Sequence, residues 1–276
     1  MVSVIDINNS YQNYNQRTQN YSNPLRRAYF SYDNQQPVIP DNNDSSKTIA
    51  TFGLLQIASI ALQKASKWFG DKLMRGKEFT SFENVAKVAQ TMIDKNKLNV
   101  SAYFINKDNI KKFPEYLRNA LTPVANGENA FYMDSAKLAV APEKKPSLIL
   151  HELGHAINAS KGKFLRFLQK SRIYSAYVPT AVLLANNMLQ DKGCHSDFIE
   201  KHAGLIGFLA FLPTVIEEGL ASYRGVNAAK KVLGKTANLK ILKKNYFTAW
   251  LTYLIGAIGL GVASKAAVIA NKNPNI

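Results

Sequence analysis

The chain has 276 residues, 46% of them hydrophobic, and its 35 Lys and Arg against 19 Asp and Glu give a formal net charge of +16. This length suffices for one sizeable core, or for a catalytic domain with membrane-embedded helices. The single cysteine, Cys194, excludes an internal disulfide. The charge suits an anionic partner. Because the basic residues cluster beside apolar stretches and no zinc-finger or RNA-recognition signature appears, we expect an anionic membrane surface and no nucleic acid.

Two regions differ in composition. Residues 1–48 are rich in Asn, Gln, Ser and Tyr, and such a stretch cannot bury enough apolar surface to offset the entropy lost on ordering. It predicts a disordered tail, so the domain is expected over 49–276. The domain begins with an apolar run over 49–62, which is short for a membrane span and suits a buried or interfacial helix.

The middle of the chain predicts short elements of both kinds. Apolar residues recur at helical spacing after Thr80 and Glu83, which form a capping box. The expected elements are a helix over 81–99, a strand over 98–105, a short helix over 110–121 that Pro114 interrupts early, and two short strands within 129–142 joined as a hairpin at Asp134 and Ser135.

Three further apolar runs follow, over 176–189, 203–216 and 247–264. The last has 18 residues without a charge and would extend about 27 Å as a helix, close to the hydrocarbon thickness of a bilayer. Lysines are denser over 230–244 than after the run, which predicts that this side faces the cytosol, together with the active site. The two shorter runs suit half-buried helices or a tight hairpin. The alternative for all three is the buried core of a soluble domain.

The chemistry centres on HELGH at 151–155, in a stretch that reads as a helix. Residues four apart stand on one face of a helix, so His151 and His155 can hold one metal ion. Glu152 between them can reach a water on that metal and act as general base. The alternative is a helix with two ordinary surface histidines. Gly154 argues against it, because a glycine inside a helix costs about 1 kcal/mol and suggests a close approach there.

A catalytic zinc needs a third protein ligand. An HExxHxxGxxH extension is absent, since Asn158 and Lys161 occupy the required positions. The remaining source is IEEGLASYRG at 216–225, where two adjacent acids end an apolar run. Such acids are costly unless they are paired or bind metal, and an exposed acidic helix end is the alternative for at least one of them. We choose Glu218.

The motif HELGH followed by Glu-x-x-Ala-Ser resembles the gluzincin metallopeptidases, whose ligand Glu is followed by a small residue at +3 and by Asp or Ser at +4. Glu218, Ala221 and Ser222 fit that register, whereas Glu217 does not. The spacing and the apolar segments are similar to the putative neutral zinc metallopeptidases of bacterial membranes. They are also similar to the CAAX prenyl protease and heat-shock membrane protease family. The likeness covers about residues 80–265.

The resemblance implies further roles. In these families the strand before the metal helix binds extended peptide by β-augmentation, which falls here on Asn129, Ala130, Phe131 and Tyr132. An ordinary edge strand is the alternative. Ser222 stands where many gluzincins have an Asp, and as a second-shell residue it would orient a zinc-binding histidine more weakly than an Asp does.

Tyr223 and Arg224 lie near Glu218 in sequence and could stabilise the transition state. Packing or a salt bridge is the alternative for each. A second metal site at Cys194, His195 and His202 matches no zinc signature, so the two histidines are expected to be ordinary polar residues.

We therefore predict an α+β, mostly helical, zincin-like metallopeptidase domain with a small sheet and membrane-embedded or buried apolar helices. It would bind one Zn²⁺ per chain and hydrolyse peptide substrates at a membrane. Two alternatives stay open. One is a catalytically inactive zinc-binding membrane scaffold, for which Glu152 would have no use. The other is a basic membrane-surface or nucleic-acid-binding protein in which HELGH is incidental.

Overall fold

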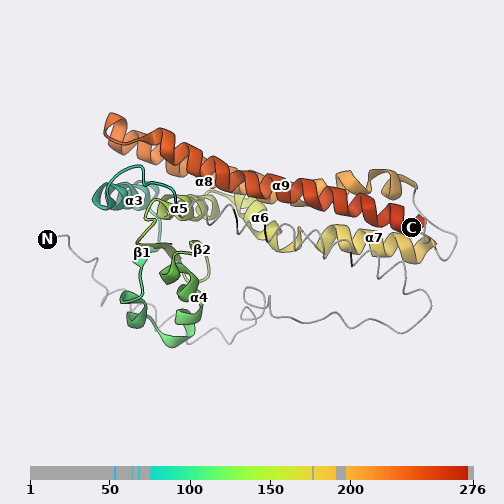
Figure 1. Ribbon diagram of the computed structural model, residues 1–276, viewed down its shortest axis with the longest axis horizontal. Coiled ribbons are helices and arrows are strands. Elements are labelled where there is room, and N and C mark those ends of the chain that lie inside the picture. Colours follow the sequence, from blue (N-terminus) through green and yellow to red (C-terminus); the bar gives the residue numbers. More distant parts are fainter. Residues whose placement is uncertain are drawn as a thin grey trace. The chain divides into compact units, whose positions relative to one another are not determined.

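The computed structural model of the protein describes residues 75–175, 177–190 and 197–272, together with the isolated residues 53, 64 and 68. The predicted tail over 1–48 and most of the first apolar run over 49–62 lie outside the described residues. The described part is a mostly helical α+β fold with one small sheet, as the sequence predicts (Figure 1).

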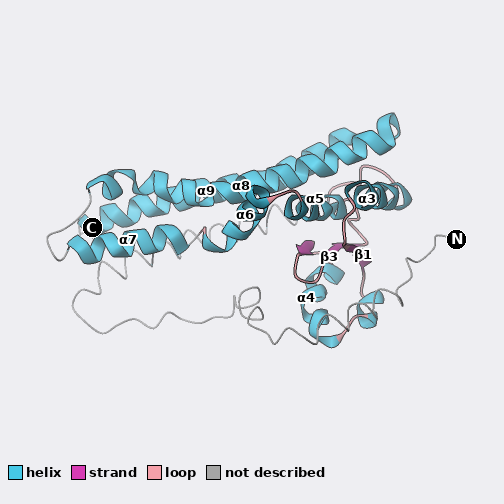
Figure 2. Ribbon diagram, turned by 180° about the vertical axis from the view of Figure 1, so that it is seen from behind, coloured by secondary structure: helices cyan, strands magenta, loops and turns pink. Residues whose placement is uncertain are grey.

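The sheet has three strands, which Figure 2 shows beside α4 (Glu115–Asn126). β3 (Leu138–Pro142) is central, parallel to β1 (Ser101–Ile105) and antiparallel to β2 (Phe131–Met133). The predicted hairpin over 129–142 is therefore confirmed. All five residues of β3 are buried, because α5 covers the sheet on one side and α4 packs against it as well.

Two helices near the sheet begin beside residues that favour a helix start. α3 (Phe82–Asn96) follows Ser81, whose side chain accepts a hydrogen bond from the amide of Asn84. The interruption expected at Pro114 is confirmed. A 3₁₀ turn, η2 (Asn109–Lys112), ends before it, and α4 starts directly after the proline, where a missing amide proton costs nothing.

The central element is α5 (Leu148–Ser160), the helix that carries HELGH. Eleven of its residues are buried between α3, the sheet and α8. Its first turn is fixed from two sides. The Tyr246 hydroxyl donates to the carbonyl of Ser147, and the buried Lys145 ammonium pairs with Glu78 at 3.1 Å. Such a helix is stabilised by its surroundings and can hold its side chains in fixed positions.

The remaining helices form an apolar bundle. α6 (Lys163–Ser171) and the 3₁₀ turn η3 (Arg172–Tyr174) lead to α7 (Tyr177–Gln190). α8 (Asp197–Leu233) is followed by a second short turn, η4 (Gly234–Thr236), and by α9 (Leu239–Lys272). Figure 1 shows α8 and α9 side by side, and α7 packs against both.

The predicted runs over 203–216 and 247–264 are parts of these two longer helices. Both α8 and α9 are long and apolar enough to cross a membrane by length and composition alone, which buried core helices can also be. They meet closely because small residues face each other. A Cβ on Gly261 would lie 2.8 Å from the carbonyl oxygen of Gly204.

Gly154 is the tightest point between α5 and α8. A Cβ there would lie 2.4 Å from the Ala221 carbonyl oxygen, which is backbone and cannot turn away. The close approach expected at this glycine is thus confirmed, and the approaching group is the backbone of α8.

Gly154→Ala should therefore force α5 and α8 apart and lower the free energy of unfolding by about 1–3 kcal/mol, as overpacking of a core does. Thermal and denaturant unfolding of the purified protein would measure the loss. Lys230→Ala, at an exposed position of α8, is the control and should change stability by no more than about 0.5 kcal/mol. Equal stability of the two variants would contradict the contact.

Candidate metal centre

The antiparallel packing of α5 on α8 sets the register of the site. Leu150 faces Gly225, Gly154 faces Ala221, and Asn158 faces Glu217, so four residues forward on α5 match four residues back on α8. Residues four apart lie on one face of a helix. One face of HELGH therefore meets one face of the segment that holds both acids.

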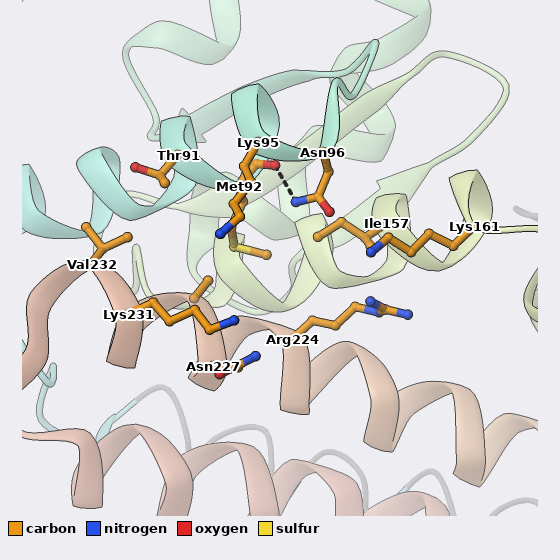
Figure 3. Close-up of a pocket in the computed structure, with 11 residues that line it drawn as sticks. Thr91, Met92, Lys95, Asn96, Ile157, Lys161, Arg224, Asn227, Lys231 and Val232 are labelled. Atoms are coloured by element: carbon orange, nitrogen blue, oxygen red, sulfur yellow. Dashed lines mark hydrogen bonds between the residues drawn. The ribbon is translucent and has the colours of Figure 1, made fainter.

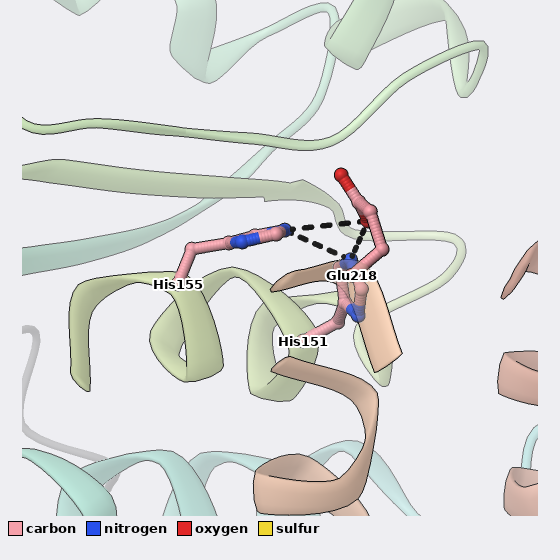
Figure 4. A group of neighbouring side chains, drawn as sticks. All are labelled: His151, His155 and Glu218. Carbon is pink, nitrogen blue, oxygen red and sulfur yellow. Dashed lines mark hydrogen bonds and ion pairs between the residues drawn. The ribbon is translucent and has the colours of Figure 1, made fainter. Parts of the chain in front are cut away.

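This register brings together the three residues expected to bind metal. His151 Nε2 lies 3.0 Å from His155 Nε2 and 3.1 Å from Glu218 Oε2, and the last two atoms are 3.6 Å apart (Figure 4). They are the one group of three or more metal-binding side chains found within the described residues. His151 is partly exposed, whereas the other two are buried.

The spacing of these atoms suits zinc. With bonds of about 2.0–2.1 Å in tetrahedral geometry, ligand atoms lie roughly 3.3 Å apart. The three observed separations lie on both sides of that value. The arrangement can therefore hold a metal ion by two imidazoles and one carboxylate.

Each histidine is oriented by a second side chain. His155 Nδ1 donates to Glu217 Oε1 at 2.7 Å, and His151 Nδ1 lies 3.1 Å from the Ser222 hydroxyl. Because the Nδ1 atoms are occupied in this way, both Nε2 atoms are directed at the common centre. Ser222 therefore lies where it can orient the His151 ring.

Glu217 differs from the sequence prediction. An exposed helix end is expected for one of the two acids, but Glu217 is 0% exposed and Glu218 is 1% exposed. Asn158 Nδ2 also donates to Glu217 Oε1 at 3.1 Å. Two adjacent acids on a helix point about 100° apart, so Glu217 reaches His155 at Nδ1 whereas Glu218 faces the Nε2 atoms of both histidines. Their burial at the end of an apolar run was the signal available in the sequence.

A cation that no sequence pattern predicts lies beside the two buried acids. Arg172, in η3, lies with Nη2 2.8 Å from Glu218 Oε1 and with Nη1 3.5 Å from Glu217 Oε2. Tyr253 of α9 also lies near the Glu218 carboxylate. Both residues come from segments outside α5 and the acidic stretch, so only the tertiary fold brings them here.

Two titratable groups on α5 have shifted pKa values. Burial raises the pKa of Glu152, although the neighbouring His155 and His151 oppose this. Burial alone would lower the pKa of His155, but Glu218 and Glu217 raise it to about 10. The two acids thus favour a proton on His155, and a metal ion bound at its Nε2 would compete with that proton.

Tyr223 and Arg224 do not reach the triad in this structure. Tyr223 is 65% exposed. Arg224 Nε donates to Asn158 Oδ1 at 2.6 Å, so its link to the metal centre runs through Asn158 and Glu217. Arg224 thus supports the residue that orients His155.

The other predicted residues fall into two groups. β2, which contains Phe131 and Tyr132, is the edge strand of the sheet and packs against α5. Asn129 and Ala130 directly precede it, and the Asn129 side chain accepts a hydrogen bond from the Ala130 amide. Of the second cluster, Cys194 and His195 lie outside the described residues, and the ring of His202 contacts that of Phe198.

Comparison with known proteins gives no family for this chain. No family model matches it, and neither a curated protein nor a solved structure does. The mostly helical α+β fold and the His-His-Glu group therefore define the chain only as a protein with a site that could bind a metal.

Glu217→Gln should weaken zinc binding by about 10–100-fold, because the His155 ring loses the charged acceptor that orients it. Competition with a chromophoric chelator would measure the affinity. Glu83→Gln, on the exposed first turn of α3, is the matched control and should bind zinc like the wild type. If both variants bound equally well, Glu217 would have no part in holding the ligand.

Proposed function

We propose that the protein is a zinc-dependent endopeptidase associated with a membrane. The observation that carries the proposal is the convergence of His151, His155 and Glu218 on one point, with Glu152 buried on the same helix. Zinc is the metal that two histidines and a glutamate with an open fourth position suit best.

Zinc held by this triad would supply an acidified water, of pKa about 7, and would polarise a peptide carbonyl. Glu152 is suited to accept the proton of that water at its carboxylate and to pass it to the departing amine. Burial raises its pKa, which makes the carboxylate a stronger base than an exposed one. Glu217, Ser222 and Asn158 keep the two histidines in position.

The substrate is expected to be an extended peptide. β2 has one neighbour, β3, so its other edge is unpaired within the described residues. A peptide added to that edge would gain backbone hydrogen bonds beside α5, which favours binding through Ala130 to Tyr132. Asn129 would fix the start of this strand through its bond to the Ala130 amide.

The negative charge that develops on the carbonyl oxygen needs a donor. Arg172 and Tyr253 suit this role better than Tyr223 and Arg224, because Arg172 pairs with the Glu218 carboxylate and Tyr253 lies near it. We assign transition-state stabilisation to these two residues. Arg172 also balances the buried acids, so it serves structure and chemistry together.

Membrane association is supported by the distribution of exposed apolar side chains. Large hydrophobic residues are exposed along α7, the first half of α8 and the second half of α9, and they include Tyr177, Met188, Leu205, Leu209, Ile216, Ile255, Ile258 and Val262. A water-soluble surface rarely exposes so many. α6 adds Phe164 and Phe167, both exposed, on a strongly basic helix of the kind that lies at a membrane surface.

The basic residues suggest an orientation. Lysines gather where α8 ends and α9 begins, over 230–244, and such residues favour the cytosolic side. Glu217 and Glu218 follow directly after the exposed apolar half of α8. We therefore expect the metal centre on the cytosolic side, near the level of the membrane surface.

Glu152→Gln tests the catalytic role. It should keep about one zinc per chain and lower the cleavage of unfolded, fluorescently labelled casein by about 10²–10⁴-fold, because a neutral amide cannot accept the proton. Metal analysis and cleavage would be measured on the full chain in detergent micelles. Glu83→Gln should match the wild type in both, and His151→Ala should lose both.

The same measurements separate the alternatives. Cleavage by Glu152→Gln at the wild-type rate would overturn the mechanism. Stoichiometric zinc without cleavage by the wild type would favour a zinc-binding scaffold. A preparation without zinc, unaffected by chelators, would favour the basic binding protein with an incidental HELGH.

Val262→Lys tests the membrane-embedded surface. Val262 is 64% exposed on α9, and a lysine in the hydrocarbon would cost about 2.5–3.5 kcal/mol, so less protein should float with lipid vesicles. Asn99→Lys adds the same charge at an exposed position outside the bundle and should leave flotation unchanged. Equal flotation of both variants would argue for a soluble bundle.

A further inference from the structure

A second feature of the molecule lies beside the metal centre. α3, the end of α5 and the last part of α8 enclose a pocket of about 210 Å³ (Figure 3). It is lined by Thr91, Met92, Lys95, Asn96, Ile157, Lys161, Arg224, Asn227, Ala228, Lys231 and Val232. None of the three metal-binding residues is among them.

The pocket carries positive charge that no acidic lining residue balances. Four of its eleven lining residues are cationic, namely Lys95, Lys161, Arg224 and Lys231, and none is acidic. Elsewhere in the described part of the chain, Lys137, Lys145 and Arg172 each pair with a carboxylate. No such pair is found for the four cations of the pocket within the described ranges. Like charges gathered on three helices repel one another, and a bound anion would relieve that repulsion.

The side chains are arranged to surround a ligand. Figure 3 shows Lys95 reaching from α3 and Lys231 from α8 on one side of the pocket, with Lys161 and Arg224 together on the other. Arg224 uses only its Nε in the bond to Asn158, so its two terminal nitrogens stay available to an acceptor. An anion held here could contact the lysine ammonium groups as point charges and the arginine guanidinium as a planar pair of donors.

From this geometry we propose that the pocket binds a phosphate group. Four cations suit an anion with more than one negative charge, and the arginine fork matches two phosphate oxygens. The volume admits a phosphate with a small organic substituent. Met92, Ile157 and Val232 add apolar surface for that substituent. The proposal is independent of the peptidase activity, since it uses none of the metal ligands.

Two sources share this chemistry: a phospholipid headgroup and a small soluble phosphate ester. Arg224 lies six residues after Glu218, which is about 9 Å along α8, on the side away from the exposed apolar half. Headgroup phosphates would lie at this level if the bundle is embedded as proposed. A soluble ester could enter from the same side.

The test uses two double variants with equal loss of charge. Lys95→Gln with Lys231→Gln removes two cations of the pocket, and Lys230→Gln with Lys240→Gln removes two exposed cations that do not line it. Arg224 is left unchanged, because its bond to Asn158 connects it to the metal centre. Zinc content is measured in parallel, so that loss of the metal site is recognised separately.

Binding would be measured by calorimetry on the full chain in micelles, with and without zinc, using glycerol 3-phosphate as the probe. We expect saturable binding of one probe per chain, weakened at least about tenfold, or 1.4 kcal/mol, in the pocket variant and unchanged within about twofold in the control. Displacement of the probe by nanodiscs containing phosphatidic acid, but not by phosphatidylcholine alone, identifies a headgroup. If glycerol 3-phosphate stays bound in the presence of either kind of nanodisc, the ligand is a soluble ester.

Two results would overturn the proposal. One is wild-type protein that binds neither glycerol 3-phosphate nor phosphatidic acid above phosphatidylcholine. The other is an equal loss in both double variants, which would mean that the overall positive charge attracts phosphate without a defined site.

Discussion

The contact between the backbones of α5 and α8 is the constraint on which the site depends. With glycine at positions 154 and 225, the helices approach closely enough for side chains one turn away to meet directly. Helices that pack at ordinary distances are 8–10 Å apart, and short side chains cannot bridge such a gap with fixed geometry. The glycine inside HELGH therefore matters as much as the residues that bind metal, since it sets the distance over which Glu218 reaches His151.

Close packing also forces a group of charges into the interior. Burying the carboxylates of Glu217 and Glu218 would be strongly unfavourable if they were alone, because desolvation of each costs several kcal/mol. His155, His151 and Arg172 provide the compensating partners. Glu152 adds a further acid to the same group, with a pKa raised by burial. Metal binding would substitute a divalent ion for protons within this group of balanced charges.

What could be foreseen from the sequence follows from how local each signal is. The spacing of His151 and His155 and the turn after Met133 depend on residues a few positions apart, and both were predicted. Glu218 was chosen by a short register, and the structure brings it to the histidines. Arg172 and Tyr253 could not be found, because nothing near them in the sequence refers to α5. Glu217 was misjudged since burial of a helix end depends on what packs against it. The predicted runs over 203–216 and 247–264 are shorter than α8 and α9. An apolar run shows only the apolar part of a helix, and both helices continue through polar residues.

The two long helices combine surfaces of different character along their length. Toward the start of α8 and the end of α9 many of the exposed side chains are large and apolar, whereas the helix ends joined by η4 are basic. The metal centre and the basic pocket both lie on the parts of α8 that face α5, after the apolar half. Arg224 belongs to the pocket and, through Asn158 and Glu217, is connected to His155. A ligand that displaced the Arg224 side chain would disturb the hydrogen bonds that run through Asn158 and Glu217 to His155. The basic end of the bundle is therefore physically linked to the orientation of a metal ligand.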